Sequence, residues 1–147
     1  MTTSVRTSVL NGYLVLMRQL GADPAEMLRR YRIAPESLAD EEALLSLRNV
    51  TQLLEASAEV TACSDFGLCL SNQQDITVLG PLAIAMQNAS TVGEALGYAS
   101  RYLFVQSPGL SFSVHDSSVL AHDSVELRVE IHLAQQPKQR QIVDLCL

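Results

Sequence analysis

Cations are scarce in this 147-residue sequence, and none lies between Arg48 and Arg101. Ten Lys and Arg residues stand against 16 Asp and Glu, so the formal net charge is -6. Because nucleic-acid binding relies on clustered cations that neutralise phosphates, this balance argues against a nucleic-acid surface. The one basic cluster is Arg29, Arg30 and Arg32. It falls at a predicted helix end, where cations complement the negative end of the helix dipole.

Cysteine and long apolar runs are also rare. Cys63, Cys69 and Cys146 form an odd set without a CxxC pair, and the three histidines do not stand at zinc-ligand spacing to them. We therefore expect reduced thiols in a cytoplasmic protein, with no metal and no cofactor. No apolar stretch approaches the length of a membrane span and no signal peptide is recognised, so we expect no membrane partner.

Catalytic signatures are lacking as well. The sequence contains no GxSxG, no HExxH, no phosphate-cradling glycine loop and no dinucleotide fingerprint. The three histidines fall in a predicted strand region, where His132 alternates onto the polar face and is more typical of a solvated side chain than of a general base. We expect no catalytic residues and no enzyme activity.

The sequence is rich in apolar residues, which recur with the helical period. At 48% hydrophobic content, 147 residues are enough for one domain with its own core, so we treat 1–147 as a single domain. The period and the capping residues predict helices over 3–20, 24–31 and 47–61, a short helix after Asp65, and two helices that begin near Pro81 and Thr91. Asp23 and Thr91 are predicted N-caps, and Asp65 can cap the short helix that follows it.

Beyond Pro108 the apolar period changes from 3.6 to 2. This alternation predicts two half-buried antiparallel strands, and the second should bury Leu127, Val129 and Ile131 while exposing Arg128. The segment after residue 137 is again predicted to be helical. The expected fold class is therefore α+β, with an amino-terminal helical layer packed on a small antiparallel sheet and the start of a carboxy-terminal helix.

A candidate ligand site lies in the helix that begins near residue 91. Tyr98 and Arg101 are three residues apart on one face, and Tyr102 is expected to point toward the core. A guanidinium beside two phenols could receive a carboxylate or another anionic effector, so Tyr98, Arg101 and Tyr102 are the candidate ligand-binding residues. Alternatively, Arg101 is a structural partner of a carboxylate such as Glu94 or Glu55.

Several short motifs follow one another in a fixed order along the chain. They are LGADP at 20–24, APESLAD at 34–40, DFGL at 65–68, LGPL at 79–82, ASTVGEAL at 89–96 and RYL at 101–103. This ordered set resembles the amino-terminal effector domain, of the arabinose-binding type, in AraC-family bacterial transcription regulators. Ser90 stands where the family's Ser-Pro-Thr has proline, so the start of that helix is less rigid here.

The resemblance implies a module that binds a small-molecule effector and passes the event to DNA only through a carboxy-terminal helix-turn-helix domain that is missing here. It implies that 1–147 is the effector-binding, regulatory fragment of a longer regulator, which could form a homodimer. The family has no shared set of ligand contacts, so no site residue is carried over. The alternatives are a ligand-free dimerisation or protein-interaction module and an enzyme with an unrecognised site.

Overall fold

The structure, a computed structural model, describes residues 3–116, 124–133 and 138–146. Its helices are α1 (Tyr13–Gln19), α2 (Pro24–Arg30), α3 (Leu47–Val60), α4 (Phe66–Ser71), α5 (Pro81–Gln87), α6 (Val92–Gln106) and α7 (Arg140–Cys146). Its strands are β1 (Ser4–Arg6), β2 (Leu44–Ser46), β3 (Leu110–Asp116) and β4 (Val125–Ile131). Short 3-10 helices are η1 (Thr7–Leu10), η2 (Pro35–Ala39) and η3 (Ile76–Leu79). The fold is α+β, as predicted.

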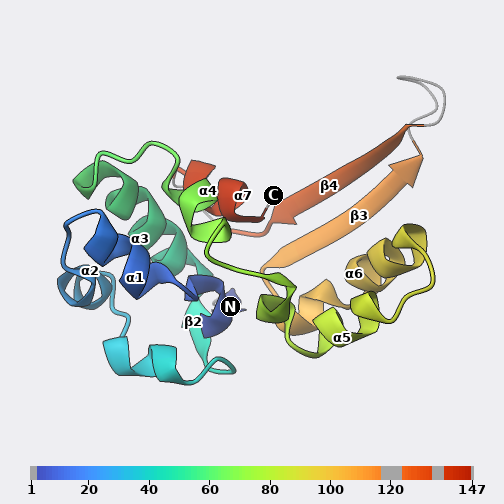
Figure 1. Cartoon of the computed structure of the whole chain (residues 1–147), viewed down its shortest axis with the longest axis horizontal. Coiled ribbons are helices and arrows are strands. Elements are labelled where there is room, and N and C mark those ends of the chain that lie inside the picture. Colours follow the sequence, from blue (N-terminus) through green and yellow to red (C-terminus); the bar gives the residue numbers. More distant parts are fainter. Residues whose placement is uncertain (1–2, 117–123, 134–137, 147) are drawn as a thin grey trace.

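The elements form two parts (Figure 1). Helices α1 to α4 and α7 make a helical body, while α5, α6 and the β3–β4 hairpin extend from it on one side. The core of the body is built from fully buried side chains such as Tyr13, Leu54 and Phe66, and the rings of Tyr13 and Phe66 meet edge to face with centroids 6.0 Å apart. Ile142 of α7 is buried in the same core. The last helix therefore belongs to the body.

The predicted helix over 3–20 is wrong in its first half. Residues 4–6 form β1, which pairs antiparallel with β2 so that Ser4 lies opposite Ser46. Pairing with a segment about 40 residues away provides hydrogen-bond partners for the backbone groups of this extended segment. Tertiary contacts of this kind override local helix propensity. Gly12, at φ 83, then sets the left-handed turn from which α1 starts.

Local capping signals were more reliable. The Asp23 carboxylate accepts a hydrogen bond of 2.9 Å from a backbone N–H in the first turn of α2. At the start of α6, the Thr91 hydroxyl accepts from the Glu94 N–H at 3.1 Å and the Glu94 carboxylate accepts from the Ser90 N–H at 2.7 Å. Both predicted caps are confirmed. Asp65 precedes α4 but makes no side-chain capping bond within the described residues, so that detail was wrong.

The two predicted strands are confirmed as the antiparallel β3–β4 hairpin, with Phe112 opposite Val129 and Val114 opposite Leu127. The predicted burial is wrong for Leu127, which is 53% exposed, and Val129 and Ile131 are only half-buried. The reason is the position of the hairpin, which extends away from the helical body from its buried end at Leu110 (Figure 1). Arg128 is exposed, as expected.

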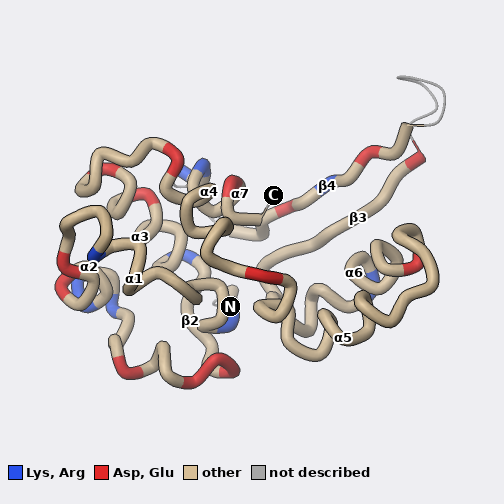
Figure 2. Tube along the Cα trace, viewed as in Figure 1, with Lys and Arg blue, Asp and Glu red and all other residues tan. Residues whose placement is uncertain are grey.

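Charge is distributed unevenly between the two parts. Figure 2 shows acidic residues spread over the helical body, whereas α5 carries no charged residue and α6 carries only Glu94 and Arg101. In the part of the chain that the structure describes, no helix has the length and apolar character needed to span a membrane. The least charged surfaces therefore lie around α5 and α6.

Candidate functional site

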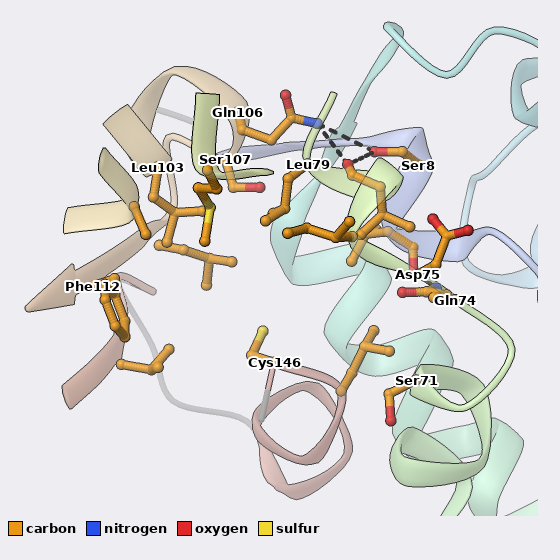
Figure 3. A pocket seen from close by; sticks show the side chains of 18 of the residues that line it. Ser8, Ser71, Gln74, Asp75, Leu79, Leu103, Gln106, Ser107, Phe112 and Cys146 are labelled. Carbon is orange, nitrogen blue, oxygen red and sulfur yellow. Dashed lines mark hydrogen bonds between the residues drawn. The ribbon is translucent and has the colours of Figure 1, made fainter. Parts of the chain in front are cut away.

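A cavity of about 570 Å³ lies where the helical body, α6 and the hairpin meet (Figure 3). The hairpin contributes Leu110, Phe112, Leu127 and Val129. Helices α5 and α6 contribute Met86, Leu96, Ala99, Leu103 and Gln106, followed by Ser107. The body contributes Ser8, Val9, Ser71, Leu145 and Cys146, and the segment through η3 adds Gln74, Asp75, Ile76, Val78 and Leu79. Segments from residue 8 to residue 146 thus line one cavity, which is open to solvent on one side near Leu127.

The two regular walls of the cavity follow from simple periodicities. Leu96, Ala99 and Leu103 are three and four residues apart on α6, so their side chains line one stripe of that helix. On the hairpin, Phe112 and Val129 are opposite each other in the register, and directly opposed side chains stand on the same face of an antiparallel pair. Both walls are apolar, and both face the same space (Figure 3).

A buried glutamine fixes the position of α6 against the body. Gln106 is 5% exposed, and its Nε2 donates to the Val78 carbonyl oxygen at 2.9 Å and to the Ser8 hydroxyl oxygen at 3.4 Å. The Ser8 hydroxyl donates to the same carbonyl at 3.0 Å (Figure 3). This network joins η1, η3 and the last turn of α6, so the frame of the cavity is formed before any ligand is bound.

Other polar side chains of the lining are also engaged within the protein. Gln74 donates through Nε2 to two backbone carbonyls of the segment 9–11, each at 2.9 Å. The Ser71 hydroxyl donates to the Leu68 carbonyl at 2.8 Å. Asp75 accepts from the Thr77 hydroxyl and from its N–H, and these hydrogen bonds lower the pKa of the Asp75 carboxyl. Asp75 therefore remains anionic at neutral pH.

Cys146 brings a thiol to the cavity from α7. Burial raises the pKa of this thiol to about 11. Because the thiolate is the reactive form, Cys146 stays a protonated and weakly nucleophilic group at neutral pH. It behaves here as a small apolar wall residue.

None of the three residues predicted as ligand contacts lines this cavity. The Tyr98 hydroxyl donates to Glu94 Oε1 at 3.2 Å, and this hydrogen bond raises the pKa of Tyr98. Arg101 is exposed. Tyr102 is 45% exposed and borders a smaller cavity of about 250 Å³ beside Pro81, so the expectation that it points toward the core was wrong. The three side chains do not enclose a common space, and their part in ligand binding stays a prediction.

The alternative partners considered for Arg101 are engaged elsewhere. Glu94 accepts from Tyr98 and from the Ser90 N–H, and the Glu55 carboxylate accepts from the Gln141 N–H at 2.8 Å. Among the described residues Arg101 forms no ion pair with either carboxylate. The structural interpretation of Arg101 as a partner of Glu94 or Glu55 is therefore wrong.

Sequence reasoning missed the cavity because its walls come from segments that are distant in the chain. One local signal was present. The apolar stripe of α6 at 96, 99 and 103 continues into Gln106, an uncharged polar residue at an inward position, and such a residue needs internal partners. The helical period predicted an inner face that contains Leu96, Ala99 and Leu103, but it also placed Val92 there, which is 77% exposed.

The described residues offer no group of three or more His, Cys, Asp or Glu side chains that could hold a metal ion. The polar groups that line the cavity are hydroxyl, amide and carboxylate groups, and they are separated by apolar walls. The arrangement is suited to hold a small molecule by shape and burial.

Comparison with known proteins places the chain in a family. Residues 21–147 match the family described as the arabinose-binding domain of AraC transcription regulator, N-term. The HTH-type transcriptional regulator VirS of Mycobacterium tuberculosis, from strains CDC 1551 / Oshkosh and ATCC 25618 / H37Rv, is 42% identical over 127 residues, which is 86% of this chain. The chain spans 37% of the length of these relatives. It therefore belongs to the family of amino-terminal, arabinose-binding-type domains of AraC transcription regulators.

Proposed function

We propose that this domain binds a small-molecule effector in the cavity between the helical body, α6 and the hairpin, and that binding controls a DNA-binding part of a longer regulator. The observation that carries the proposal is the cavity itself, about 570 Å³ in volume and framed by the buried network around Gln106. This volume lies in the range of sites for small molecules.

The position of the cavity supports a regulatory role. Its walls belong to two parts of the molecule, with Leu103 on α6, Phe112 on the hairpin and Leu145 on α7. A ligand that contacts all three favours the arrangement in which they are close together. If that arrangement has a different affinity for DNA in the whole regulator, the ligand shifts the population of DNA-binding states.

The test is a thermal-shift screen of metabolites against this chain, followed by titration of the hits into two variants. Leu127→Asp places a charge in the cavity wall, whereas Val125→Asp, two residues away on the same strand face, does not. The two side chains are 53% and 60% exposed, so both substitutions should affect folding little. Loss of binding in Leu127→Asp alone is expected, and equal affinities of the two variants would contradict the proposed site.

A ligand-free interaction module is the second candidate, and one observation favours it. Large apolar side chains are exposed on α5 and α6, including Ile84 at 64% and Phe104 at 61%. Exposed apolar side chains that gather on neighbouring helices, as α5 and α6 are, form the kind of apolar surface that contacts another protein. Sedimentation of the chain over a range of concentrations, with a Phe104→Ser variant beside it, would detect self-association through this surface.

A further inference from the structure

Among the described residues, the cavity lining contains a single charged residue, Asp75, and no lysine, arginine or histidine. A carboxylate or phosphate that entered the cavity would lose its hydration without gaining a cation in return. It would also meet the negative charge of Asp75. The lining therefore disfavours anionic ligands, in contrast to the site first expected around Arg101.

Most polar side chains of the lining are already bonded within the protein. The amide N–H groups of Gln74 and Gln106 and the hydroxyls of Ser8 and Ser71 all donate to backbone carbonyls of the protein. These groups hold the cavity together, and a ligand would have to break the bonds in order to use the same donors.

Ser107 is different. It directly follows α6, its N–H donates to the Leu103 carbonyl, and its carbonyl accepts from the Leu110 N–H. The residue is only 7% exposed, and no hydrogen bond of its hydroxyl is found among the described residues. Figure 3 shows Ser107 among the apolar side chains of Leu103 and Leu79 at the cavity. Among the described residues this hydroxyl oxygen is not one of the fully buried side-chain atoms that lack a partner, so it is accessible to a ligand that enters the cavity.

We infer that the cavity takes an uncharged, largely apolar molecule that carries one hydrogen-bonding group, which meets the Ser107 hydroxyl. The inference rests on the proposed function and deepens it, because it names the chemical class of the effector. The apolar body of the ligand lies between Leu103, Phe112 and Val129, and its polar group lies at the end of α6.

The charge preference is tested with N-phenyl-1-naphthylamine, an uncharged dye whose fluorescence rises in apolar surroundings, and the chain has no tryptophan to interfere. The dye is displaced with 1-octanol or with octanoate at pH 7.5. Wild type should bind 1-octanol at least about tenfold more tightly than octanoate. The preference for 1-octanol over octanoate should become smaller in two variants. Leu127→Lys places a cation in the cavity wall, and Asp75→Asn removes the anion.

The polar contact is tested with two serine variants that both line the cavity. Ser107→Ala should weaken 1-octanol binding about fivefold, the loss expected for one neutral hydrogen bond. Ser71→Ala should leave the affinity unchanged, because the Ser71 hydroxyl is bonded to the Leu68 carbonyl. Equal effects of the two substitutions would overturn the role of Ser107.

The outcomes separate this inference from the proposed function. If wild type bound octanoate as tightly as 1-octanol, the inference of an uncharged ligand would be overturned. If that binding were also abolished by Leu127→Asp but not by Val125→Asp, the proposed effector site would still be supported. No uptake of the dye, and no displacement, would also overturn the inference of an apolar ligand. The effector site itself would then be decided by the metabolite screen and its own pair of variants.

Discussion

At the scale of single residues, Tyr13 is the largest fully buried side chain of the helical body. Its hydroxyl lies 2.8 Å from the Ser57 hydroxyl oxygen, and Ser57 in turn donates to the Leu53 carbonyl at 2.7 Å. Burial raises the pKa of Tyr13 to about 12. The phenol is therefore held in its neutral form inside the core.

This buried phenol predicts a specific loss of stability at high pH. The pKa of Tyr13 in the folded protein, about 12, exceeds its ordinary value of 10, so the unfolded chain loses the proton first. The neutral Tyr13 phenol therefore contributes fully to the free energy of unfolding below pH 10. This contribution is lost between pH 10 and about 12, at up to about 1.4 kcal/mol per pH unit. Urea melts at several pH values in this range should show that the free energy of unfolding falls more steeply with pH for wild type than for Tyr13→Phe. Titration of the buried Cys146 thiol affects the stability of both proteins equally and so cancels in the comparison. Parallel plots of unfolding free energy against pH for the two proteins would contradict the prediction.

Local chemistry made single residues the most predictable part of the sequence. Asp23 and Thr91 cap their helices because the signal needs only the next two or three residues. Tyr102 was misplaced for the opposite reason. A period of 3.6 predicts an apolar stripe on a helix, but the neighbouring elements decide how much of the stripe is covered. Leu96 and Ala99 of the predicted stripe face the cavity, whereas Tyr102 at its edge is left exposed.

At the scale of elements, the contact between α4 and α7 attaches the last helix to the body. The Gly67 N–H donates to the Gln141 side-chain oxygen at 2.8 Å, and the Gln141 side-chain nitrogen donates to the Ser64 carbonyl at 2.9 Å. A methyl group on Gly67 would overlap the Gln141 carbonyl oxygen and lie 3.1 Å from the Asp144 Cβ. Glycine is therefore required here by the close approach of two helices.

A pair of glycine substitutions tests this contact. Gly67→Ala should destabilise the chain by about 2–3 kcal/mol, because the added methyl forces α7 away from α4. Gly97→Ala is the matched control, since Gly97 lies in exposed α6 with no atom within 4 Å of an added Cβ. Alanine should stabilise that helix by about 0.5–1 kcal/mol. Similar free energies of unfolding for the two variants would mean that the α4–α7 contact is looser than described.

The elements themselves were predicted with mixed success, and the range of the interactions explains why. Some elements show a clear apolar period within their own sequence. These are the helices over 24–31 and 47–61 and both strands of the hairpin. The strand at 4–6 is not among them, because it is stabilised by contacts that are distant in sequence, namely its pairing with 44–46 and the burial of Val5 in the core. The exposure of Leu127 could not be anticipated either, since alternation indicates which side of a strand is apolar but not whether another layer covers it.

At the scale of the whole molecule, the candidate site depended on long-range assembly. The family resemblance anticipated effector binding, but the proposed contacts Tyr98, Arg101 and Tyr102 were chosen because they are neighbours in sequence. The cavity instead combines residue positions as distant as Ser8 and Cys146. Only a three-dimensional structure brings such positions together.

The charge of the chain leads to a prediction about DNA. The formal net charge is -6, and the family match includes no stated DNA-binding segment in residues 21–147. We predict that this chain alone does not bind DNA specifically, because its acidic net charge disfavours phosphate contacts and the sequence shows no basic reading helix for base contacts. Nanomolar, sequence-dependent binding in a mobility-shift titration at physiological salt would contradict this expectation.

The location of the bound ligand is the most direct test of the proposed effector site. With three phenylalanines and four tyrosines in the chain, aromatic ring signals can be assigned and intermolecular nuclear Overhauser effects to 1-octanol measured. Contacts from the octyl chain to the Phe112 ring and to the methyl groups of Leu103 and Leu127 are predicted. Contacts confined to the Tyr98 and Tyr102 rings, or none at saturating 1-octanol, would contradict binding in the cavity.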